Sequence, residues 1–157
     1  MRRLLPLAAI FVFLAAGAAP SFAANEKDRP ICFSLGNENY RDANKFDPGL
    51  AACSRMINSG RYKDKALPAI YRARGSWKQK KGELDASLAD YDQASRIDPT
   101  YAAAYYSRGL IYEKWHDVDK ARTEYNSAIA VPTKDRIAQW AQDNARARLK
   151  ALAEDSK

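Results

Sequence analysis

Apolar residues recur at helical spacing in the last part of the chain. An apolar side chain stands at every fourth position there, and charged residues fill the opposite face. This periodicity places the apolar residues on one side of a helix, and Asp135 stands where an N-cap is favoured. The pattern predicts a capping helix with a short tail over 136–157. The apolar positions are Ile137, Ala141, Ala145 and Leu149.

Two similar units of 34 residues precede this helix. Residues 68–101 and 102–135 coincide at eight positions without a gap. A period of this length indicates stacked pairs of helices, each pair joined by a short turn. The coinciding residues are Ala69/Ala103, Tyr71/Tyr105, Arg74/Arg108, Gly75/Gly109, Lys80/Lys114, Asp85/Asp119, Tyr91/Tyr125 and Ala94/Ala128. The predicted helices span 66–81, 83–96, 100–115 and 118–131.

Glycines lie at positions that a helical repeat makes informative. Gly75 and Gly109 fall inside the first helix of each unit, where Gly costs about 1 kcal/mol relative to Ala. Their presence in both units predicts close approach of a neighbouring helix, with Tyr91 and Tyr125 packing around them. Gly82 stands between two predicted helices, where a left-handed residue ends a helix.

A shorter helical segment lies before the two units. Asp47 is the expected N-cap of a helix over 47–59, and Leu50, Cys53 and Ile57 share one of its faces. The segment 47–67 therefore reads as a degenerate repeat helix with a linker. Residues 24–46 show no such period, and we expect an irregular N-terminal segment there.

The first residues have the composition of an export signal. Arg2 and Arg3 precede an apolar run of 16 residues, and small residues follow at Ser21 and Ala23. This order is typical of a cleaved secretory signal peptide, so we predict cleavage after Ala23 and a periplasmic or secreted protein. An uncleaved anchor is the alternative. The run is short for a bilayer, and no stable membrane span is expected after cleavage.

Composition and charge narrow the class of partner. The chain has 157 residues, 46% of them hydrophobic, which suits one globular domain. Its formal charge of +7 falls to +5 when residues 1–23 are removed. This surplus favours acidic partners or anionic surfaces, and export argues against nucleic acid as a partner.

Cys32 and Cys53 are the two cysteines of the chain. In an exported protein an even pair predicts one disulfide, here stapling the N-terminal segment to the helix that carries Cys53. A reactive-thiol site is the weaker alternative, because the chain lacks a C-x-x-C motif and its one histidine, His116, lies far off in sequence.

The order of residue types in the two units resembles the tetratricopeptide repeat (TPR) family, and the chain looks like a small exported bacterial member. Each unit has an aromatic residue, Gly, a small residue, a second aromatic, Ala and Pro. Arg74 and Arg108 depart from the pattern, since Leu is usual there. The resemblance implies an all-α fold, a short TPR-type helical-hairpin solenoid with a disulfide-stapled N-terminal segment and a C-terminal capping helix. The matching residues are Tyr71, Gly75, Ser87, Tyr91, Ala94 and Pro99, then Tyr105, Gly109, Ala121, Tyr125, Ala128 and Pro132.

The resemblance also implies a binding face. In the family, the first helix of each unit lines a concave groove that holds a peptide. The residues carried over as peptide-binding are Arg72, Ser76, Gln79, Tyr106, Leu110 and Glu113, with Ala69 and Ala103 beside them. We expect Tyr106 to be exposed for binding, and Tyr105 and Tyr112 to lie in the core.

Motifs of catalysis are absent from the sequence, which has no H-E-x-x-H, Gly-rich phosphate loop or G-x-S-x-G. The leading hypothesis is a non-catalytic adaptor for an unidentified protein or peptide, without metal or cofactor. Binding of anionic envelope polymers is a second hypothesis, and a small enzyme that uses His116 is a third. Five cations within 72–81 read as a solvated helix face or as a patch for an acidic peptide. The sequence leaves self-association open as a way to extend the stack.

Overall fold

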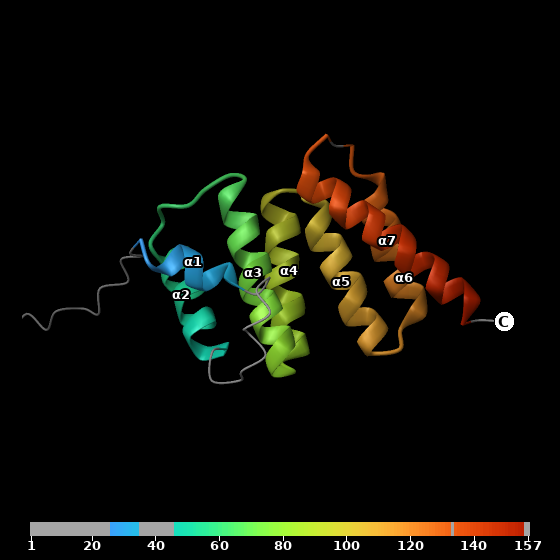
Figure 1. The fold of residues 1–157 in the computed structure, drawn as a ribbon, viewed down its shortest axis with the longest axis horizontal. Coiled ribbons are helices and arrows are strands. Elements are labelled where there is room, and N and C mark those ends of the chain that lie inside the picture. The colour runs from blue at the N-terminus through green and yellow to red at the C-terminus, as the bar shows by residue number, and fades with distance from the viewer. Residues whose placement is uncertain (1–25, 35–45, 133, 156–157) are drawn as a thin grey trace, which may run out of the picture.

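The computed structural model describes residues 26–34, 46–132 and 134–155, and these form helices packed side by side in chain order (Figure 1). The predicted signal peptide, 1–23, lies outside the described residues, as does 35–45 of the N-terminal segment. Within the described part no helix is long and apolar enough to cross a membrane. The helices are α1 (Asp28–Cys32), α2 (Phe46–Asn58), α3 (Ala66–Lys81), α4 (Leu84–Ile97), α5 (Ala102–Lys114), α6 (Val118–Ala130) and α7 (Arg136–Glu154).

The helices from α2 onward begin and end within two residues of their predicted bounds. Two expectations at the N-terminal end are wrong. Residues 24–46 are not wholly irregular, because the five-residue α1 forms there. Asp47 is not an N-cap, because α2 already begins at Phe46; the Asp47 carboxylate instead accepts a hydrogen bond from Lys81 Nζ at 2.8 Å.

The two central hairpins, α3–α4 and α5–α6, pack through the predicted glycines. A Cβ on Gly75 would lie 2.6 Å from the ring of Tyr91, and one on Gly109 would lie 2.4 Å from the ring of Tyr125. Both tyrosines are fully buried. Ser87, where the family pattern has a small residue, is buried and donates a hydrogen bond to the carbonyl of Gly75 at 2.8 Å.

Replacing Gly109 by Ala is expected to lower the free energy of unfolding by about 1–3 kcal/mol through overpacking. The loss should occur although Ala favours helices over Gly by about 1 kcal/mol, because the new methyl group would meet three ring atoms of Tyr125. Urea denaturation followed by circular dichroism measures the change. The cost should shrink when Tyr125 is also replaced by Leu, and a stabilised Gly109→Ala protein would contradict the close approach.

A buried cluster joins the N-terminal elements to α3. Cys32 and Cys53 form the predicted disulfide, with their Cα atoms 4.9 Å apart. The fully buried Trp77 donates from its indole nitrogen to the carbonyl of Cys32 at 2.9 Å. Asp28 is also buried, and its carboxylate accepts hydrogen bonds from Nε of Arg55 at 3.1 and 3.2 Å. These contacts hold α1 against α2 and α3.

An arginine clamp repeats in the two hairpins at the position where the family has Leu. Arg74 donates to Asp90 through Nε at 2.9 Å and through Nη2 at 2.6 Å. Arg108 donates to Glu124 at 2.9 and 2.7 Å, and also to Asp92 at 3.0 Å. Such bidentate pairs hold the planar guanidinium in one orientation. The departure from Leu therefore replaces an apolar contact by an oriented ionic one.

The last helix, α7, covers the apolar end of the stack as the sequence predicted. Ala141 and Ala145 are fully buried in the core that α5 and α6 form. The buried Gln142 donates to the carbonyl of Val131 at 2.6 Å, just beyond the end of α6. Asp135 caps α7, because its carboxylate accepts from the backbone nitrogen of Ile137 at 2.7 Å.

Replacing Asp135 by Ala is expected to cost about 1 kcal/mol of stability, since the first turn of α7 loses its cap. Asp135→Asn is the matched control, because it keeps the accepting oxygen and should retain most of that stability. Thermal unfolding of the two variants beside the parent protein checks the order. Equal melting temperatures for Asp135→Ala and the parent would rule out this role for the cap.

Candidate peptide-binding groove

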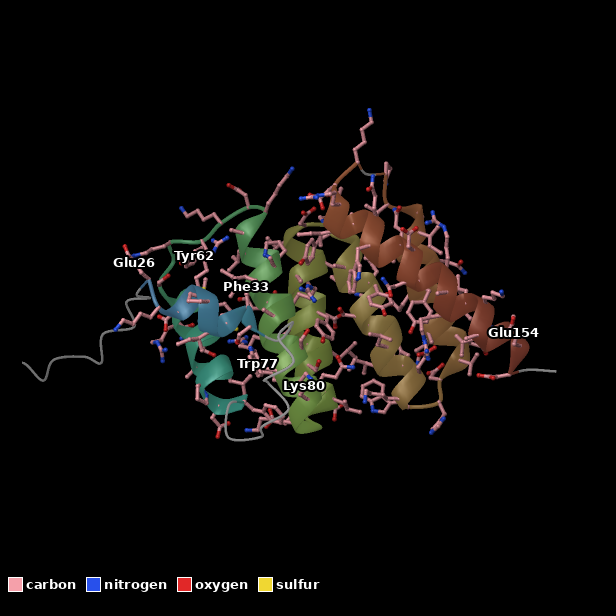
Figure 2. All side chains as sticks on the ribbon, in the orientation of Figure 1. Glu26, Phe33, Tyr62, Trp77, Lys80 and Glu154 are labelled. Atoms are coloured by element: carbon pink, nitrogen blue, oxygen red, sulfur yellow. A yellow bond between two sulfur atoms is a disulfide. The ribbon has the colours of Figure 1, made fainter. Side chains whose placement is uncertain are left out.

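A groove of about 580 Å³ runs along α3, and we call it the α3 groove. Its floor comes from α3, while α1 and α7 stand on opposite sides of that helix (Figure 1). Figure 2 marks Phe33 and Lys80, which both line it. The lining residues are Cys32, Phe33, Arg72, Ala73, Ser76, Gln79, Lys80, Lys114 and Trp140.

Three of the six predicted binding residues meet in this groove. Arg72, Ser76 and Gln79 line it and are half-buried. Nε of Arg72 donates to the hydroxyl of Tyr101 at 3.0 Å, and Gln79 accepts from the hydroxyl of Tyr91 at 3.0 Å. Internal hydrogen bonds therefore orient these two side chains before any ligand arrives.

The expectation that Tyr106 is exposed is wrong. Tyr106 is only 9% exposed, and its ring packs against Tyr125 and edge-on against Trp140 of α7. Burial raises the pKa of the Tyr106 hydroxyl. Tyr105 and Tyr112, expected in the core, are half-buried and pack against its edge. The helix α7 covers the face of α5 that the family pattern leaves open.

The other two residues predicted on α5 also lie outside the α3 groove. Leu110 is half-buried and packs against the core formed with α7. Glu113 accepts hydrogen bonds from Nε of Arg148 at 3.1 and 3.0 Å, so its charge is matched within the protein. That bond raises the pKa of Arg148. The second half of the predicted binding face is therefore closed by the chain itself.

The cations of the basic run divide between ion pairs within the protein and the groove. Arg74 and Lys78 both pair with Asp90, and Lys81 pairs with Asp47 and Glu83. Arg72, Lys80 and Lys114 instead line the α3 groove, which has no carboxylate among its described lining residues. The described lining of the groove is thus positively charged.

Sequence reasoning missed the two aromatic walls of the groove and the cation Lys114, whereas Lys80 belonged to the run read as a possible patch for an acidic peptide. Phe33 and Trp140 are 38% and 50% exposed, and they come from segments read as irregular and as a cap. Lys80 and Lys114 coincide at the 34-residue offset, a signal that could have marked them. Nothing in the sequence places Phe33 or Trp140 beside α3, because each reaches it through tertiary packing alone.

Catalytic and metal chemistry find little support in the described residues. They contain no cluster of three or more His, Cys, Asp or Glu side chains suited to a metal ion. His116 occupies the turn between α5 and α6 with a positive φ of 58°, and its ring is exposed. It does not line the α3 groove.

Comparisons with known proteins agree with this architecture. A family model described as TPR repeat matches residues 80–114, and one described as Tetratricopeptide repeat matches residues 102–134. The chain is 24% identical over 116 residues to the chloroplastic tetratricopeptide repeat domain-containing protein PYG7 of Arabidopsis thaliana. That match covers 74% of this chain and 36% of the relative, so the chain spans about a third of the relative's length.

A solved structure shares the fold. The crystal structure of the Sgt2 TPR domain from Aspergillus fumigatus superposes with a TM-score of 0.56 at 13% identity, over 87% of this chain and 88% of that chain. The helical hairpins, the repeat period and the family models lead to the same conclusion: the chain contains tetratricopeptide repeats and folds as a short TPR-type solenoid.

Proposed function

We propose that this protein is a non-catalytic interaction module that binds an extended segment of a partner protein in the α3 groove. The observation that carries the proposal is the groove itself, where pre-oriented Arg72 and Gln79 share the lining with two exposed aromatic side chains. Aromatic and arginine side chains contribute most to binding at protein interfaces. TPR folds typically serve as scaffolds for protein partners, which fits the lack of a catalytic constellation in the described residues.

The proposed place of action is outside the cytoplasm, in the periplasm or beyond the cell. Two features support it: the signal-like composition of residues 1–23 and the disulfide between Cys32 and Cys53. Cell fractionation followed by mass measurement of the intact protein tests this. The exported protein should begin at Ala24, and a cytoplasmic protein that retains Met1 or Arg2 would contradict it.

Photo-crosslinking in cells tests the groove. A benzoylphenylalanine in place of Phe33 keeps an aromatic ring at the groove wall, and the same residue in place of Trp115 is the matched control. Both native side chains are 38% exposed, but Trp115 does not line the groove. We expect a discrete protein adduct from position 33, none from position 115, and loss of the adduct when Arg72 is replaced by Glu.

The outcomes separate this function from the binding of anionic envelope polymers. Equal adducts at both positions, or none at either, would remove the groove as a protein-binding site. A polymer bound through charge alone would show steep loss of affinity with salt. A protein segment that also contacts Phe33 and Trp140 should show a weaker salt dependence.

A further inference from the structure

A second hollow adjoins the α3 groove near the N-terminal end of α3. It has a volume of about 290 Å³, and Phe33 lines both it and the α3 groove. In Figure 2 Tyr62 and Phe33 are labelled above and to the left of Lys80. Its apolar lining leads us to call it the apolar hollow. The lining residues are Arg29, Phe33, Met56, Tyr62, Lys65, Ala66, Ala69 and Ile70.

Cations lie on both sides of Phe33. Arg72, Lys80 and Lys114 line the α3 groove, while Arg29 and Lys65 line the apolar hollow. No carboxylate is among the described residues that line either one. Complementary potentials determine which partners an interface accepts, so this surface selects for negative charge on both sides of an apolar contact.

The position of Phe33 between the two hollows is fixed by its neighbours. Phe33 follows α1 directly, and α1 is held by the disulfide of Cys32 and by the bond between Asp28 and Arg55. The guanidinium of Arg29 lies 5.9 Å from the centre of the Phe33 ring. The spacing from the apolar hollow to the cations of the α3 groove is therefore built into the fold and does not depend on the partner.

We infer that the partner segment is acidic, lies within its chain, and carries one large apolar side chain that enters the apolar hollow against Phe33. Its carboxylates then follow α3 past Phe33 and meet Arg72, Lys80 and Lys114. Since cations flank Phe33 on both sides, the segment continues in both directions, and a free carboxyl terminus is not needed. This inference rests on the proposed function and specifies its ligand.

Synthetic peptides test the chemistry of the ligand. The probe is a fluorescein-labelled, amidated peptide with one central leucine that alternating glutamate and serine flank on both sides. It is titrated with the oxidised protein and read by anisotropy. Replacing its leucine by serine should weaken binding at least about tenfold, since burial of a leucine side chain is worth about 1.5–3 kcal/mol. Replacing its glutamates by glutamines should weaken binding by a similar factor, and a free carboxyl terminus should change it less than about twofold.

Protein variants locate the two contacts. Lys80→Glu should weaken binding of the leucine peptide about tenfold or more. Lys150→Glu is the matched control. It changes the charge by the same amount at a side chain of α7 that is 80% exposed and lines neither hollow, so it should leave binding unchanged. Phe33→Ala should abolish the preference for leucine over serine in the peptide. Phe33→Leu keeps an apolar contact and should preserve part of that preference. This variant separates loss of the contact from unfolding of α1.

Each opposite result overturns a stated part of the inference. Equal binding of the glutamine peptide would remove the acidic requirement, and equal binding of the serine peptide would remove the apolar hollow as a binding site. Binding that needs a free carboxyl terminus would point to capture of a chain end. If any of these occurs while benzoylphenylalanine at position 33 still gives a groove-specific adduct, the proposed function stands with a different ligand. Loss of that adduct removes both.

Discussion

Replacing Trp77 by Ala should lower the free energy of unfolding by about 3–5 kcal/mol. Trp77 is fully buried, and its ring lies against Gly49, where a Cβ would stand 2.3 Å away. The ring also packs against Phe46, with centroids 6.1 Å apart. The change would leave a cavity where α1, α2 and α3 meet and would free the carbonyl of Cys32 from its hydrogen bond.

Urea denaturation of the oxidised proteins measures this loss, with Trp115→Ala as the matched control. Trp115 is 38% exposed, so its removal should cost much less than that of Trp77. Trp77→Phe should fall between the two, because Phe fills part of the cavity but donates no hydrogen bond. If Trp77→Ala cost no more than Trp115→Ala, Trp77 would not be the centre of the N-terminal core.

Removal of the disulfide should cost about 3 kcal/mol, the figure expected for a closed loop of this length. The two half-cystines are separated by 21 residues and are both fully buried. Cutting the bridge restores freedom to the unfolded chain, and it releases α1 from α2. We expect the backbone amides of α1 and of the part of α2 around Cys53 to lose protection from hydrogen exchange, while the amides of α5 to α7 keep theirs.

Denaturation of the parent protein with and without reductant measures the loss, and hydrogen exchange locates it. A variant with Cys32→Ser and Cys53→Ser is the control, because it should show the lower stability and no response to reductant. Unchanged stability of the reduced parent would contradict a structural role for the bridge. A fall in protection across α5 to α7 would show that the stack unfolds as one unit.

Local patterns in the sequence were sufficient to predict most helices. The repeat period, the capping residue Asp135 and the turn residue Gly82 each act within a few residues of their own position. The close contacts at Gly75 and Gly109 could also be predicted. Glycine recurs at the same position inside the first helix of both units, which indicates a neighbour that leaves no room for a side chain.

Half of the candidate site could be predicted in the same way. Arg72, Ser76 and Gln79 lie on α3, whose groove face remains open, so their positions along the repeat were sufficient. Tyr106 stands at the equivalent place on α5 but is buried, because Trp140 of α7 packs on it. A repeat pattern assigns the same face to both helices and contains no information on which one a later helix will cover.

The sequence by itself determined the helices, their pairing into hairpins, the disulfide partners and the need for a cap at the end of the stack. The helices, their pairing and the cap follow from residue spacing and turn residues, which can be read over short stretches of sequence. The disulfide follows from the presence of two cysteines. Tertiary structure alone decided which groove stays open and what borders it. Phe33 and Trp140 come from distant ends of the described chain. They border the same groove because α1 docks on α2 and α3 while α7 docks on α5 and α6, through contacts between elements that no local pattern encodes.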